Sequence, residues 1–113
     1  MSNLLTSKIL GERHCTDIII FLHMFGPRSR TEIYNSISTG SGMARKLNNL
    51  EEKGIVRSVP MENSKRVLLY LTPLGVSYAN ALEQLEQKSG GDLDRYRIDT
   101  VRGMMPPYSR NVE

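Results

Sequence analysis

The chain has 113 residues, of which 39% are hydrophobic and one is a cysteine, and its formal net charge is +3. This length fits one small domain with a modest core. A single cysteine excludes an intrachain disulfide and a cysteine-based zinc cluster. The longest apolar run, residues 18–22, is too short to span a bilayer. Since no stretch of signal-peptide length precedes it, we expect a cytoplasmic protein without a membrane partner.

The positive charge is concentrated in the middle of the chain. Residues 28–66 carry eight Lys and Arg against four Asp and Glu, a net charge of +4. The remaining residues carry seven against eight, a net charge of −1. A clustered excess favours a polyanionic partner more strongly than the mild sequence pI of about 9.2 does.

The N-terminal quarter of the chain predicts two helices. Residues 1–13 hold leucines and isoleucines at the spacing of a short amphipathic helix. The run DIIIFLHMF, residues 17–25, is apolar almost all round and predicts a central core helix. Thr16 is the expected N-cap of that helix, and Gly26-Pro27 is its expected end.

The basic middle segment predicts two more helices joined by a short turn, which is the helix-turn-helix pattern. Ser29 and Glu32 have capping-box spacing and predict a helix that ends near residues 39–40. Ser41 is the expected N-cap of the next helix, at about residues 41–53, which Gly54 closes. Its expected apolar stripe is Met43, Ala44, Leu47 and Leu50.

A β-hairpin and a further helix follow. Two strand-like runs flank the polar loop 60–65, so we expect a wing at about residues 55–71. Thr72-Pro73 predicts the start of a helix that runs to residue 87. Residues 89–91 read as a hinge before a short helix at 92–102 and an irregular tail. We therefore expect a winged-helix domain at 1–88, with its core at 15–87, and a C-terminal extension at 89–113.

Three segments carry a family resemblance. They are GPRSRTEIYNSIS (26–38), SGMARKLNNLEEKGIV (41–56) and RVLLYLTPLG (66–75). Over roughly residues 15–87 they resemble the MarR and HxlR families of prokaryotic transcription regulators. The resemblance implies a mainly α fold with a small β-hairpin, the winged helix-turn-helix. It also implies a sequence-specific double-stranded DNA-binding regulator, with helix 41–53 in the major groove and the wing on the backbone or minor groove.

Ten residues are candidates for DNA contact. The small residues at the start of helix 41–53 allow close approach, so Arg45 can make a bidentate contact with a guanine and Asn49 can contact an adenine. Lys46 and the wing residues Lys65 and Arg66 suit phosphates. A solvated helix face and a charged hairpin turn are the alternative interpretation. The full set is Arg28, Arg30, Thr39, Ser41, Gly42, Arg45, Lys46, Asn49, Lys65 and Arg66.

Surface apolar residues suggest protein partners. The helix 73–87 carries a long apolar stripe, so we expect a homodimer built from this helix with residues 1–13 and 92–102. On the second wing strand, Leu68 and Tyr70 face away from the core if their neighbours face inward, and we expect them to be buried within the chain. The alternative function is a winged-helix protein-interaction module in a replication or transcription assembly.

Catalysis is not expected. His14, Cys15 and Asp17 do not have a metal-ligand spacing on one helix face, and no glycine-rich phosphate loop follows a strand. We therefore predict no enzyme activity, no cofactor and no metal, and interpret Cys15 as a structural thiol. Flanking helices shorter than those of MarR-type proteins argue against a small-molecule effector.

Overall fold

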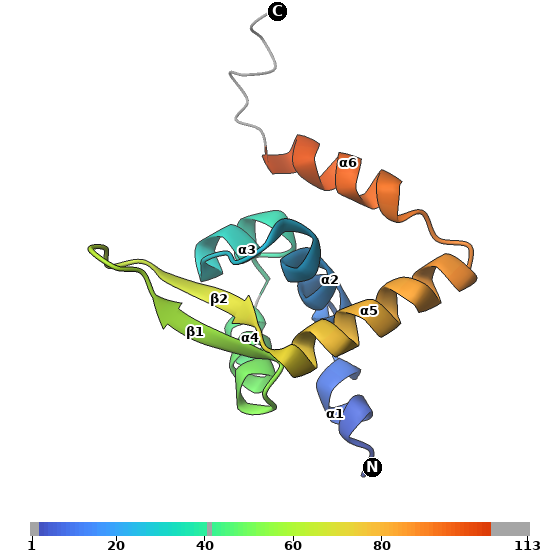
Figure 1. Ribbon diagram of the computed structural model, residues 1–113, viewed down its shortest axis with the longest axis horizontal. Helices are drawn as coiled ribbons and strands as arrows, with labels where there is room; N and C mark the ends of the chain where they lie inside the picture. Colours follow the sequence, from blue (N-terminus) through green and yellow to red (C-terminus); the bar gives the residue numbers. More distant parts are fainter. Residues whose placement is uncertain (1–2, 41, 105–113) are drawn as a thin grey trace, which may run out of the picture.

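The computed structural model describes residues 3–40 and 42–104. A two-stranded hairpin projects from one side of a group of five helices, and a sixth helix lies across the top of the view (Figure 1). In chain order the elements are α1 (Leu5–Leu10), α2 (Cys15–Phe25), α3 (Arg30–Ser36), α4 (Met43–Glu52), β1 (Val56–Pro60), β2 (Val67–Leu71), α5 (Pro73–Lys88) and α6 (Leu93–Met104). This architecture is a winged helix-turn-helix and confirms the predicted fold class.

The core forms around α2. Ile18, Ile19 and Phe21 are fully buried, as the almost uniformly apolar sequence of this helix predicts. Single side chains from α3 and α4, such as Ile33 and Leu47, close the core from the other side and are equally buried. Because each such side chain contributes about 1.5–3 kcal/mol through burial, these contacts fix α3 and α4 relative to α2.

Helix ends agree with the sequence where a side chain caps them. The capping box of α3 is confirmed, because the Glu32 amide donates to Ser29 Oγ at 3.2 Å and the Ser29 amide donates to Glu32 Oε1 at 3.0 Å. The Thr72 cap of α5 is also confirmed, since its hydroxyl oxygen accepts from the Gly75 amide at 3.0 Å. Gly26 ends α2 as expected.

Three other helix ends differ from the prediction. The N-cap of α2 is His14 in a left-handed conformation, φ 73°, so the assignment of Thr16 as the cap is wrong. The N-cap of α4 is Gly42 at φ 92°, so the assignment of Ser41 is also wrong, and Ser41 itself lies outside the described residues. Helix α3 ends at Ser36, a few residues earlier than predicted. Neither His14 nor Gly42 caps its helix with a hydrogen bond from its side chain to the backbone of the first turn, so the sequence carried no capping signal there.

The wing is an antiparallel pair in which Val56 lies opposite Leu71 and Pro60 opposite Val67. Its core side is fixed by the fully buried Leu69, whose amide donates to the Arg28 carbonyl at 2.8 Å. The expected burial of both outward residues of β2 is wrong for Tyr70, which is 36% exposed. The reason is that a two-stranded hairpin has only one face on the core.

The base of the wing is tied to the end of α4. The Thr72 amide donates to the Ile55 carbonyl at 3.0 Å, and its hydroxyl donates to the Gly54 carbonyl. A Cβ at position 75 would collide with the Ile55 carbonyl, so only glycine permits this close approach of α5 to the chain before β1. The hairpin therefore leaves the core at a fixed angle beside α4.

Helices α5 and α6 leave several apolar side chains exposed to solvent. The buried positions of α5 are the small Gly75 and Ala79, which leaves Leu74 47% and Leu85 58% exposed. Helix α6 contacts α3 and α5 and has no fully buried residue. None of the described helices combines the length and the hydropathy needed to cross a membrane.

Candidate nucleic-acid interface

Helix α4 has one buried and one open face. Met43, Leu47 and Leu50 point into the core, as predicted. Ala44, which the sequence placed in the same stripe, is exposed, and that assignment is wrong. The reason is helical spacing, because position 44 lies about 100° around the axis from Met43. The exposed positions of the helix are Ala44, Arg45, Asn48 and Glu52.

The N-terminal segment lies along one side of α4 and engages two of the predicted contact residues. The Arg45 guanidinium donates from Nη1 to Glu12 Oε2 at 2.7 Å and from Nη2 to Glu12 Oε1 at 2.6 Å. One turn later, Asn49 Nδ2 donates to the Lys8 carbonyl at 3.2 Å. The candidate reading residues are thus held by contacts to the end of α1 and the turn that follows it.

Lys46 lies on the inner side of this arrangement. Its exposed fraction is only 9%, and its charge helps to lower the pKa of the Glu12 carboxyl. An ammonium in this position offers little surface to a phosphate, so the expected phosphate contact of Lys46 does not fit its burial.

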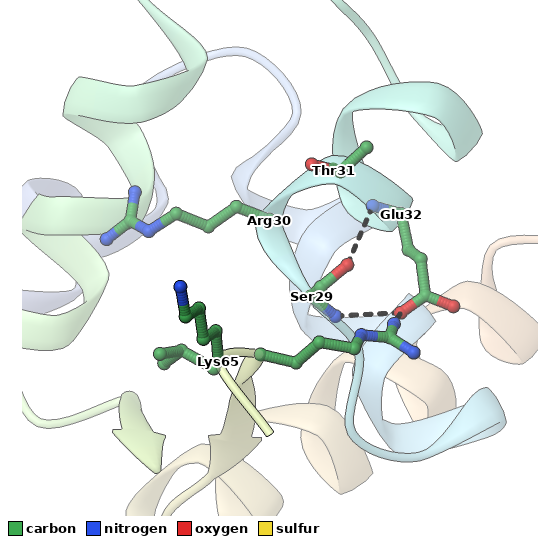
Figure 2. Close-up of a pocket in the computed structure, with 7 residues that line it drawn as sticks. Ser29, Arg30, Thr31, Glu32 and Lys65 are labelled. Carbon is green, nitrogen blue, oxygen red and sulfur yellow. Dashed lines mark hydrogen bonds and ion pairs between the residues drawn. The ribbon is translucent and has the colours of Figure 1, made fainter. Parts of the chain in front are cut away.

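A groove of about 520 Å³ separates the start of α3 from the wing (Figure 2). In Figure 2 the Arg30 side chain reaches away from α3 toward α4, and Lys65 rises from the wing on the opposite side. Among the described residues, Lys65 has no acidic partner within 4 Å. The groove is lined by Ser29, Arg30, Thr31, Glu32, Lys65, Arg66 and Val67.

Carboxylates anchor the two arginines of this groove. Arg66 Nη2 donates to Glu32 Oε1 at 2.9 Å, which links the wing to the capping box of α3. Arg30 Nη2 donates to Asn48 Oδ1 at 2.7 Å and lies 3.9 Å from Glu51 Oε1. Because Arg30 both lines the groove and bonds to an exposed residue of α4, the groove and the outer side of α4 form one continuous surface.

The glutamates that hold Arg45 and Arg66, Glu12 and Glu32, are stabilised in the ionised form. The hydrogen bond from Arg45 is the main cause that lowers the pKa of Glu12. The pKa of Glu32 is lowered mainly by the hydrogen bond from the Ser29 amide, with a smaller contribution from Arg66. Both groups are therefore anionic at neutral pH, and the surface alternates cations with fixed carboxylates.

The remaining predicted contact residues lie around the edge of this surface. Arg28 lies where the chain bonds to β2, and its Nη1 donates to the Pro27 carbonyl at 2.8 Å. Thr39 is exposed in the turn between α3 and α4, and Gly42 is the left-handed residue that begins α4. The expected role of Ser41 falls outside the described residues.

The groups considered for catalysis lie elsewhere. His14 Nδ1 lies 3.3 Å from Asp17 Oδ2, while His23 Nδ1 lies 2.8 Å from Glu83 Oε2 on α5. Burial raises the pKa of the Cys15 thiol, which keeps it protonated at neutral pH. Among residues 3–40 and 42–104, no three His, Cys, Asp or Glu side chains come together in a way that could hold a metal.

Sequence reasoning missed three residues of this surface. Asn48 was not selected, although it lies one helical turn from the exposed Ala44 and Glu52 on the outer side of α4. Thr31 follows Arg30 in the first turn of α3 and could have been found from the capping box. Glu12 carried no sequence signal, because its partner Arg45 is 33 positions away.

Comparison with known proteins identifies the fold but no family. No protein-family model and no curated protein matches the chain significantly. The chain is similar to two structures of mutant ZitR from Lactococcus lactis, one of them in the apo form. The apo structure is 18% identical with a TM-score of 0.60, and the match covers 86% of this chain and 70% of that one. The second is 17% identical with the same TM-score, covering 99% and 69%. These matches agree with the winged-helix fold.

Proposed function

We propose that this protein binds double-stranded DNA in a sequence-specific manner and regulates transcription. Helix α4 enters the major groove with Arg45 and Asn48 toward the base edges, since a major groove admits one α-helix. The wing follows the backbone or the minor groove, where Lys65 contacts phosphate without reading sequence. The resemblance to MarR- and HxlR-type regulators and the fold shared with ZitR support this assignment.

One observation carries the proposal. The cations of the groove and the outer side of α4 are continuous through the hydrogen bond between Arg30 and Asn48. A backbone-binding groove directly beside a base-reading helix matches the two kinds of contact that a specific DNA-binding protein needs. Four of the eight cations within residues 28–66 lie on this surface: Arg30, Arg45, Lys65 and Arg66.

Selection from a random duplex library tests the function. We expect an enriched motif, and a dissociation constant that rises steeply with salt because phosphate contacts release counterions. A protein that enriches no motif, and whose binding to any duplex does not depend on salt, would contradict the proposal. The surface would then fit the protein-interaction function better.

We further propose that the protein is a homodimer. Side chains that one protomer leaves exposed include Leu5 at 66%, Leu85 at 58% and Ile98 at 46%, on three different helices. Two-fold symmetry would cover them and present two copies of α4 to a palindromic site. We expect sedimentation at tens of micromolar protein to give a dimer and the selected motif to be a palindrome. A monomer would leave these side chains available for a different protein partner.

A further inference from the structure

The turn between α1 and α2 places a carboxylate against the predicted reading arginine. Glu12 meets Arg45 with both oxygens, at 2.6 and 2.7 Å from the two terminal nitrogens. Arg30 and Arg66 also meet carboxylates, but those belong to α4 and α3, inside the helix-turn-helix itself. Glu12 is different because it reaches α4 from the N-terminal segment.

The pairing leaves part of the guanidinium open. A guanidinium has an end-on edge formed by Nη1 and Nη2, and a side-on edge formed by Nε and Nη2. Glu12 occupies the end-on edge, while the Arg45 side chain as a whole is still 64% exposed. Among the described residues, the hydrogen bonds of Arg45 all go to Glu12. The side-on edge is therefore the one that Glu12 leaves free, and it carries two donors in the plane that a guanine O6 and N7 can accept.

The surroundings of the pair support this orientation. Gly42 lies beside Arg45, and a Cβ added there would come to 3.5 Å of Nη2, in van der Waals contact, so glycine leaves this nitrogen more room than a larger residue would. The backbone that carries Glu12 is itself held, because its carbonyl accepts from the Cys15 amide at 3.3 Å. The bond from Asn49 to the Lys8 carbonyl fixes the end of α1 one turn further along α4.

A carboxylate on a DNA-binding surface lowers the affinity for DNA, so its presence there needs an explanation. It repels phosphates and so weakens binding to every duplex alike. An arginine held in one orientation, however, loses less conformational freedom when it meets a base edge, and it discriminates better against the wrong base. Glu12 can thus lower general affinity and raise specificity together.

We propose that Glu12 is a specificity-determining positioning residue, which holds Arg45 end-on so that its side-on edge reads one guanine in the major groove. This inference rests on the proposed function. Glu12 acts through Arg45 and does not contact the base.

The experiment compares Glu12→Gln with Glu62→Gln. Glu62 is an exposed carboxylate of the wing loop, so its replacement removes the same charge without touching Arg45 or the open face of α4. Dissociation constants are measured by fluorescence anisotropy for the duplex that the parent protein selects and for a scrambled duplex, at two salt concentrations. Thermal unfolding of each variant establishes that it is folded.

We expect Glu12→Gln to lower the ratio of specific to non-specific affinity by about three- to tenfold. This is less than the full discrimination of a bidentate contact, because Arg45 itself remains in the variant. Repeated selection with this variant should show a relaxed preference at one guanine of each half-site. Glu62→Gln should change both affinities by the same factor, because the wing contacts phosphate without reading sequence. In an Arg45→Ala background, Glu12→Gln should leave the ratio unchanged, because the residue through which it acts is gone.

Parallel tightening on both duplexes by Glu12→Gln, with the base preference intact, would overturn the inference, because Glu12 would then only compete with DNA for Arg45. An unchanged ratio would overturn it as well. Failure of the parent protein to select any duplex is a separate outcome, and it would contradict the proposed function before Glu12 is tested.

Discussion

The α4 side and the wing side of the basic surface are built in different ways. On α4, Arg45 and Asn49 both bond to the N-terminal segment, and the helix itself is fixed by fully buried leucines. On the wing, residues 61–67 are exposed, and Lys65 has no acidic partner among the residues that the structure describes. Arg66 ties the end of this loop to Glu32 of α3.

This difference separates two tasks that DNA recognition combines. Reading base edges needs donors in fixed positions, whereas phosphate contact depends mostly on charge and tolerates small shifts. The rigid, carboxylate-held side of the surface therefore suits discrimination, and the open side suits affinity. Three predictions test how far this division holds.

The largest expected effect is on stability, for a substitution where α4 packs on the core. Leu47→Ala should lower the free energy of unfolding by about 2–5 kcal/mol, because Leu47 is fully buried and its removal leaves a cavity. Val67→Ala on the wing, where the side chain is 42% exposed, should change it by no more than about 0.5 kcal/mol. Urea denaturation measures both, and similar losses would mean that the wing is as firmly packed as α4.

The next effect concerns binding. Arg45→Ala should weaken the selected duplex by about 1–3 kcal/mol and relax one position of the motif, because a base-reading contact is lost. Lys65→Ala together with Arg66→Ala should weaken all duplexes alike and reduce the salt slope by about one unit per lost phosphate contact.

Titrations of selected and scrambled duplexes at several salt concentrations separate these two signatures. If Arg45→Ala bound both duplexes as the parent does, α4 would not be the reading helix. If the wing variant lost sequence preference rather than general affinity, the division between the two sides would be reversed.

The smallest effect is a pH dependence of the free energy of unfolding, caused by Glu32 where the wing meets α3. The pKa of Glu32 is lowered in the folded state, so its contribution to stability is present above its ordinary value of 4.5 and is lost as the pH falls through the lowered pKa. Since the side chain is 43% exposed, solvent screening keeps this contribution below about 1 kcal/mol.

Denaturation of the parent and of Glu32→Gln at pH 7 and at pH 3 checks the sign. Glutamine retains the capping-box geometry but cannot ionise, so the difference between the two proteins should shrink at pH 3. A difference that grows on acidification would show that the Glu32 carboxylate is not stabilised in the folded protein.

Local signals in the sequence determined most of the fold. The capping box at Ser29 and Glu32, the Thr72 cap and the alternation around Leu69 depend on neighbours within a few positions. The order of helices and hairpin then leads to the winged-helix architecture. Helix starts without a capping side chain, at His14 and Gly42, were misplaced because nothing local marks them.

The partners of the charged residues were decided only by the tertiary structure. The sequence indicated a basic middle segment and identified Arg45 as the candidate reader. It did not indicate that Glu12 would meet this arginine or that Lys46 would turn inward. The physical reason is range: helix caps and strand alternation act over a few residues, whereas an ion pair forms between any two elements that packing brings together. The positions of α1 and the wing relative to α4 therefore determine which cations remain exposed on this surface.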